Sequence, residues 1–181
     1  LRRRLAAHYV YHRRSLLRNA IVSWSSDGRV AGVEVPGRLD ACAEVEFYNG
    51  ILIPDLVDAH CHLELSHLEG AIPPGGGFTA FARSMGNVRE VKSPEERLQA
   101  AAEADRRLWR QGVGGVGDIC NGDSTFALKA GSEVEYRNFL ELFGLGVVSA
   151  QGMEALAQRA GAYGLSCSVT PHSTYSLQEE A

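Results

Sequence analysis

The sequence predicts an α/β fold in which a small β-rich segment precedes strands that alternate with helices. Residues 1–54 carry short runs of β-branched and aromatic residues that are separated by turns. From residue 55 onward, apolar runs of strand length alternate with helical segments, which is typical of βα units around a parallel sheet. The 181 residues are 45% hydrophobic and 22% charged, as in an ordinary globular protein.

The segment 1–54 is expected to form a small antiparallel β unit. Asp27-Gly28 lies between two β-rich runs and is typical of a hairpin turn, because glycine adopts positive φ without strain. Pro36-Gly37 marks a second break in the pattern. The strands are predicted at residues 8–11, 20–24, 30–35 and 45–48.

The following segment begins with the apolar run 51–59, which is predicted to be a strand covered on both faces. Ser93-Pro94-Glu95-Glu96 then opens a strong helix, since serine is a good N-cap and proline suits the first helical position. Further strands are predicted within 113–119, 134–143 and 165–170, and further helices at 78–85, 124–130, 153–162 and from 176 onward.

This alternation predicts about four βα units, which do not close a barrel. A complete (β/α)8 barrel, the TIM barrel, takes ~250 residues, and residues 55–181 supply about half of that length. We therefore expect the first part of such a barrel, and an unusual open sheet is the alternative.

Composition excludes several classes of function. The net charge of −4 gives no electrostatic reason to expect a nucleic-acid partner, and no run approaches the ~18 apolar residues of a membrane span. The arginine-rich N-terminal end lacks the apolar stretch of a targeting peptide. Four scattered cysteines without a Cys-x-x-Cys pair favour a reducing compartment, so the cytoplasm is expected. Whether the protein forms a homo-oligomer is left open.

The most informative segment holds His60 and His62. Alternate residues of a strand share a face, so these two imidazoles project together while Cys61 points the other way. They follow an apolar strand, at the end where barrel active sites lie. Neutral imidazole is a good ligand of zinc and iron, so the pair predicts a divalent metal site. The alternative is two polar residues that hydrogen-bond loop carbonyls.

The stretch 53–62 resembles the first barrel strand of the amidohydrolase superfamily, in which an apolar run and Pro-Gly precede Asp-x-His-x-His. Asp55 stands where glycine is usual. The upstream β unit resembles the small N-terminal β-sandwich of that family. The resemblance thus implies a β-sandwich segment over 1–54 and an incomplete metal-dependent hydrolase barrel over 55–181. The continuation 63–70 is most similar to the adenosine and aminofutalosine deaminase branch.

The resemblance also implies roles for particular residues. The stretch 170–176 is similar to a Pro-His-x-x-Tyr segment whose histidine contacts substrate, which assigns His172 to substrate binding. Glu64 shares the face of the histidine pair if the strand continues, and could bind a ribose or an amine; a solvated loop carboxylate is the alternative. Binuclear members carry a carboxylated lysine on the fourth strand, whereas Lys92 and Lys129 lie outside the predicted strands. One metal ion is therefore expected, zinc first and iron second.

The implied reaction is metal-dependent hydrolysis of a carbon–nitrogen bond that is not a peptide bond. The expected substrate is a small purine nucleoside-like molecule such as aminofutalosine, which is deaminated. The general acid–base residue and the remaining ligands are expected beyond Ala181, so these 181 residues alone are expected to be inactive. The alternatives are ring or amide hydrolysis by another amidohydrolase, a TatD-like metal-dependent nuclease, and an inactive remnant that only binds.

Weaker candidates lie close to the predicted site. His67 and Glu69 could line the pocket from the loop that follows the histidine pair. Asp118 and Asn121 end the second barrel strand and are expected to cap the next turn. Arg137 and Glu141 share a face of the third strand, where they could pair with each other.

Overall fold

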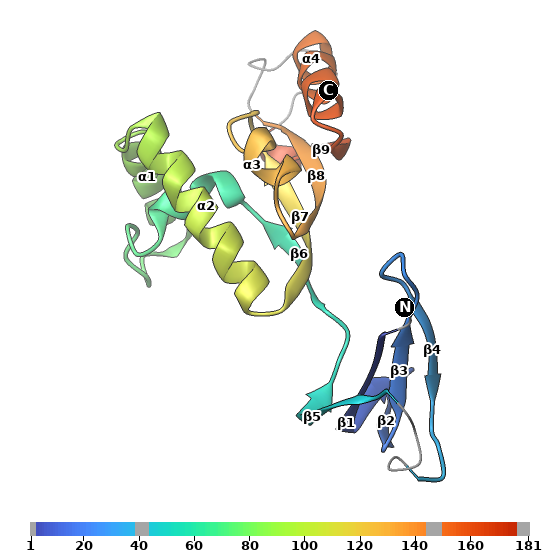
Figure 1. Cartoon of the computed structure of the whole chain (residues 1–181). Coiled ribbons are helices and arrows are strands. Elements are labelled where there is room, and N and C mark those ends of the chain that lie inside the picture. Colours follow the sequence, from blue (N-terminus) through green and yellow to red (C-terminus); the bar gives the residue numbers. More distant parts are fainter. Residues whose placement is uncertain (1–2, 39–43, 144–149, 177–181) are drawn as a thin grey trace. The chain divides into compact units, whose positions relative to one another are not determined.

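The computed structural model describes residues 3–38, 44–143 and 150–176, and it divides into two compact units, Leu1–Pro54 and Asp55–Ala181 (Figure 1). Each unit contains one sheet. No helix in the described ranges is both long and apolar enough to cross a membrane.

The first unit is a five-stranded sheet in which β1 pairs with β2, β3 and β5, and β3 pairs with β4. The expected hairpin joins β3 to β4, and Gly28 adopts a φ of +80° in its turn. Pairing is antiparallel except between β1 and β5, which run parallel. The strands are β1 (Arg3–His12), β2 (Ser15–Arg18), β3 (Ile21–Trp24), β4 (Val30–Glu34) and β5 (Glu46–Leu52).

The second unit alternates strands and helices, as the sequence predicts. Its sheet has the order β6-β7-β8-β9, and every neighbouring pair is parallel. The strands are β6 (Leu56–Cys61), β7 (Val113–Cys120), β8 (Glu135–Leu142) and β9 (Ser166–Pro171). The helices are α1 (Gly77–Val88), α2 (Pro94–Arg110), α3 (Phe126–Ala130) and α4 (Ala150–Ala162), with 3₁₀ turns η1 (Leu63–Leu68) and η2 (Thr174–Ser176). The part of the helix predicted beyond residue 176 lies outside the described residues.

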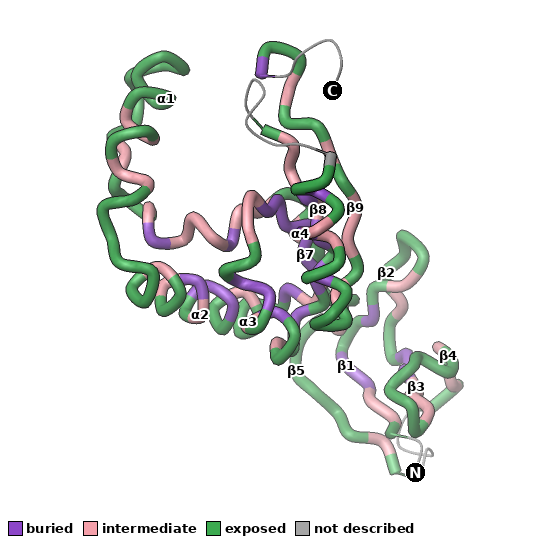
Figure 2. Tube along the Cα trace, turned by 90° about the horizontal axis from the view of Figure 1, so that it is seen from above, coloured by how far each residue is buried: buried purple, intermediate pink, exposed green. Residues whose placement is uncertain are grey.

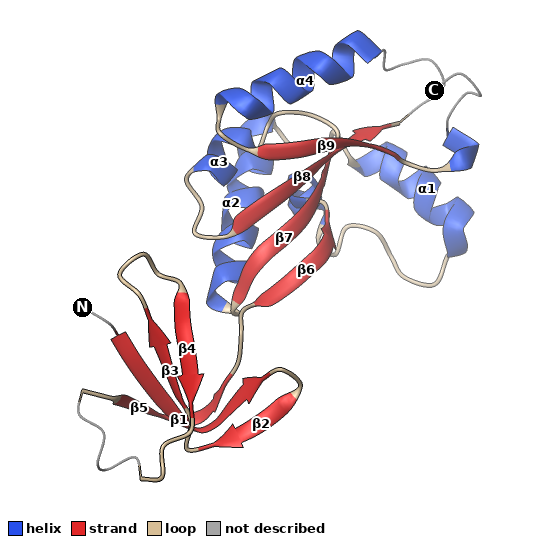
Figure 3. Cartoon of the chain, turned by 90° about the vertical axis from the view of Figure 1, so that its right-hand side faces the viewer, coloured by secondary structure: helices blue, strands red, loops and turns tan. Residues whose placement is uncertain are grey.

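Helices cover one face of this parallel sheet (Figure 3). Helix α2 begins with the predicted capping box, in which Ser93 and Glu96 exchange side-chain and backbone hydrogen bonds. Its buried Ala101 and Ala104 pack against Leu63 and Val116. A second cluster joins α3 and α4 to β7 and β8 and consists of Cys120, Phe126, Leu140, Met153, Leu156 and Ala160. Strands β7 and β8 accordingly contain many of the buried residues of this unit (Figure 2).

The opposite face of the sheet, called the inner face below, is open in the described structure. Val57 on β6 lies on this face and is 73% exposed. The expectation of one strand over 51–59 with both faces covered is therefore wrong. Residues 51–52 belong to β5 of the first unit, and no strand is formed at residues 53–55, around Pro54. Helices cover only one side of β6 (Figure 3). The barrel-type sheet nevertheless forms its first four strands.

Candidate active site

The histidine pair lies at the carboxyl end of β6, where the strand contains a β-bulge. Three residue steps separate Asp58 from Cys61, but only two separate their partners Val116 and Asp118 on β7. Such a bulge re-aims the side chains that follow it. Cys61 packs into the cluster on the helix-covered face, so its neighbours His60 and His62 fall on the inner face.

The structure brings the two predicted metal ligands together. The ring centroids of His60 and His62 are 5.3 Å apart, with an angle of 66° between the ring planes. Nδ1 of His62 is buried and has no hydrogen-bond partner among the described residues. A buried polar atom without a partner is costly, so this nitrogen is the feature of the pair that fits an additional ligand.

The surroundings of His62 favour the neutral imidazole that a metal requires. Burial lowers the pKa of His62, the negative charge of Glu141 opposes that shift, and the neighbouring His60 adds to it. No group of three or more histidine, cysteine or acidic side chains in the described ranges forms a metal site. Within the described ranges, the pair is therefore not part of a larger cluster of possible metal ligands.

Glu64 follows His62 by two residues and lies in η1, not on the strand. The sequence left open whether the strand continues through Glu64, and it does not, because η1 begins at Leu63. Arg89 donates to Oε1 of Glu64 at 3.2 Å, and the backbone N–H of Asn121 lies 3.3 Å from both carboxylate oxygens. Burial raises the pKa of Glu64 despite the opposing positive charge of Arg89.

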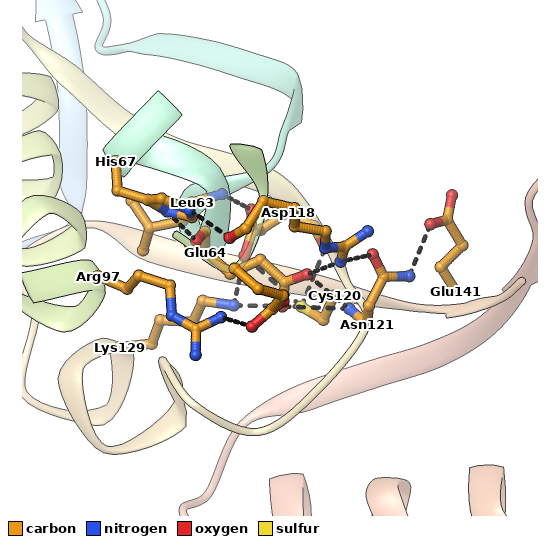
Figure 4. A network of polar contacts seen from close by, with 11 residues as sticks. Leu63, Glu64, His67, Arg97, Asp118, Cys120, Asn121, Lys129 and Glu141 are labelled. Carbon is orange, nitrogen blue, oxygen red and sulfur yellow. Dashed lines mark hydrogen bonds and ion pairs between the residues drawn. The ribbon is translucent and has the colours of Figure 1, made fainter. Parts of the chain in front are cut away.

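Asn121 connects this carboxylate to β8. Its Oδ1 accepts a 2.9 Å hydrogen bond from Arg89, and its Nδ2 donates to Oε2 of Glu141 at 2.7 Å (Figure 4). The expected pairing of Arg137 with Glu141 is not seen, since four residues on a strand span roughly 13 Å. We call the four side chains Glu64, Arg89, Asn121 and Glu141 the rim network. Its long-range contacts were not predicted from the sequence.

A cavity of about 230 Å³ is lined in part by three members of the rim network, Glu64, Arg89 and Asn121. His67 lines this cavity and is only 5% exposed, but the cavity is not a pocket at the histidine pair. Its two ring nitrogens lie within hydrogen-bond distance of the carbonyl oxygens of Glu64 and Arg89. The ring therefore connects the end of α1 to η1. The histidine pair does not line this cavity. Glu69 does not line it either, and forms an ion pair with Arg107 at 3.0 Å.

His172 directly follows β9. Its backbone N–H donates to the carbonyl of Leu142 at 3.1 Å, which sets it beside the end of β8. Nδ1 lies 2.8 Å from Oγ of Ser176, and the ring makes edge contacts with Phe143 and Tyr175. Because the carboxyl ends of parallel strands meet at one edge of the sheet, His172 and the histidine pair share that edge.

Both lysines lie away from the strands, as the sequence predicts. Lys92 is in the bend before α2, and Lys129 is in α3. Lys129 is buried on the helix-covered side, where it forms an ion pair with Asp118 and donates to Asn138 at 2.9 Å. Asp118 therefore does not simply cap the following turn. Because Lys129 is fully buried in an ion pair, it is not free to act as a metal ligand beside the histidine pair.

The fold of the chain is similar to that of solved deaminase structures. Aminofutalosine deaminase of Helicobacter pylori, in complex with methylthio-coformycin, matches with a TM-score of 0.79 and 21% identity, covering 98% of this chain and 45% of that chain. Adenosine deaminase from Xanthomonas campestris, with bound zinc, matches at 0.70 and 19% identity over 98% and 44% of the chains. Guanine deaminase from C. acetobutylicum, with bound guanine, matches at 0.71 and 12% identity over 99% and 48%.

The chain thus has the fold of the N-terminal part of amidohydrolase-superfamily barrel proteins, as the sequence resemblance implies. It spans less than half the length of these structures. No family model matches the sequence, and no significant match to a curated protein is found.

Proposed function

We propose that this chain is part of a metal-dependent hydrolase of carbon–nitrogen bonds, and that the whole protein deaminates a purine nucleoside-like substrate such as aminofutalosine. The observation that carries the proposal is the paired His60 and His62 at the carboxyl end of the first barrel strand, with Nδ1 of His62 buried and unpartnered. In this proposal, residues 1–54 are the β-sandwich segment and residues 55–181 are the incomplete barrel.

We assign His60 and His62 as two ligands of one divalent ion. Zinc is the first choice, since the similar adenosine deaminase was solved with bound zinc, and iron is the alternative. When bound, the ion would lower the pKa of a water molecule and so supply hydroxide near neutral pH. The part played by this chain is to hold two neutral imidazoles together on the open inner face. A separate carboxylate is needed to carry the proton to the leaving ammonia.

We assign His172 and Glu64 to substrate binding. The ring of His172 is fixed at the same sheet edge by Ser176 and by edge contacts with Phe143 and Tyr175. A carboxylate offers about four acceptor positions, and the contacts of Glu64 with Arg89 and Asn121 take up about three of them. One acceptor position of Glu64 remains for a substrate donor.

A second candidate function is hydrolysis of another carbon–nitrogen bond by the same type of site. A triazine hydrolase variant matches the chain with a TM-score of 0.66 and 15% identity, covering 98% of this chain and 48% of that chain. One fold supports several substrates, so the substrate must be determined directly.

The experiment is an ammonia-release assay on the protein that carries this chain. We expect release from adenosine or from a nucleoside with a larger 5′ substituent, and loss of release after chelation or after His62→Ala. The variant His12→Ala, on β1 of the other unit, is the matched control and should retain activity. Release from triazines but not from purines would favour the second candidate, and no release from either class would contradict the proposal.

A further inference from the structure

We propose that Glu141 is a ligand-binding residue of this site and accepts a hydrogen bond from a hydroxyl or amino group of the substrate. The substrate class rests on the proposed function above. Glu141 is the last residue but one of β8, which runs parallel to β7. It therefore lies at the same carboxyl edge of the sheet as His62.

The pattern of β8 places Glu141 on the inner face. Its strand neighbours Tyr136 and Leu140 are buried on the helix-covered side. Arg137 and Phe139 instead line the hollow of the inner face. Glu141 continues the alternation of Arg137 and Phe139, so its side chain projects on the face that carries the histidine pair.

Hydrogen bonding fixes the orientation of the Glu141 carboxylate. Arg89 can only donate, so the atom of Asn121 that faces it must be the amide oxygen. Nδ2 of Asn121 is then directed at Oε2 of Glu141, at 2.7 Å. The other carboxylate oxygen points away from the network (Figure 4).

The acceptor positions of Glu141 are mostly unused. Among the described residues, this half-buried carboxylate accepts one hydrogen bond, from Asn121. That bond takes up one of about four acceptor positions. An ionised carboxylate can only accept, so the partners it lacks are donors. Glu141 does not join the histidines in a metal cluster in the described structure. A donor group of the ligand is therefore the partner that its position fits.

The test compares Glu141→Gln with Glu135→Gln, an exposed residue at the opposite end of β8. Glutamine keeps the shape but offers an amide in place of the free acceptor. Affinities are measured calorimetrically, in the protein that carries this chain, for adenosine, 2′,3′-dideoxyadenosine and purine riboside. We expect Glu141→Gln to weaken adenosine binding about tenfold, because a hydrogen bond to a charged group is lost. Glu135→Gln should leave it unchanged.

The analogue that escapes this loss identifies the donor: dideoxyadenosine lacks the 2′- and 3′-hydroxyls, and purine riboside lacks the amine. The affinity of that analogue also shows that the variant is folded. An equal loss for all three ligands, no loss for any, or no binding of any nucleoside by the unsubstituted protein would overturn the assignment. Binding without ammonia release would reject the deaminase proposal and leave the role of Glu141 standing.

Discussion

The backbone N–H of Leu63 donates a 2.7 Å hydrogen bond to Oδ1 of Asp118. Leu63 directly follows His62, and Asp118 lies on β7 in a buried ion pair with Lys129 of α3. The turn after the histidine pair is therefore held by a charge pair on the helix-covered side of the sheet. Removing one partner of such a pair leaves an uncompensated buried charge.

Replacing Lys129 by methionine should lower the free energy of unfolding by about 3 to 5 kcal/mol, because Asp118 would lose its counter-charge while remaining buried. Urea denaturation monitored by circular dichroism measures the change. Lys92→Met is the matched control, since Lys92 is exposed in the bend before α2, and it should change stability by less than about 0.5 kcal/mol. Equal effects of the two substitutions would contradict the role given to the buried pair.

Cys120 should react slowly with iodoacetamide while the protein is folded. Burial, reinforced by the negative charge of Asp118, raises the pKa of its thiol to about 12, and the side chain is buried against Leu140 and Phe126. At pH 8 the thiolate fraction is then on the order of 10⁻⁴, and the thiolate is the reactive form. Mass spectrometry of labelled peptides with and without urea checks this. Labelling of Cys120 at the same rate in both conditions would contradict the buried setting.

The isolated 181-residue chain should bind a hydrophobic dye strongly or aggregate. Val57 on β6 and Phe139 on β8 line an open hollow on the inner face, and exposed apolar patches of this kind promote association. Dye fluorescence and size-exclusion chromatography measure the effect. A compact monomer that melts cooperatively and binds no dye would show that the inner face needs no further cover.

Much of the fold could be predicted because its signals are local. The capping box of Ser93 and Glu96 marks the start of α2 within four residues, and the alternation of apolar runs predicts the parallel strands. Strand alternation is enough to predict that His60 and His62 share a face, although it gives no sign of the β-bulge in β6. These features require no knowledge of which segments meet in space.

The features that were missed depend on contacts between distant residues. The chain leaves the strand after His62, where the bond from Leu63 to Asp118 joins residues 55 positions apart. The rim network likewise links Asn121 to Arg89 and Glu141. No local pattern in the sequence shows such pairings, so the sequence alone could not decide whether the strand continues through Glu64.

The most direct test of the account is the zinc content of the protein after metal removal, zinc reloading and dialysis, measured by inductively coupled plasma mass spectrometry. His60 and His62 are predicted to hold about one ion per chain, as in a single-metal hydrolytic site. The double variant His60→Ala/His62→Ala should lose this zinc, whereas His12→Ala should retain it. Undiminished zinc in the double variant would contradict the assignment of the histidine pair as metal ligands.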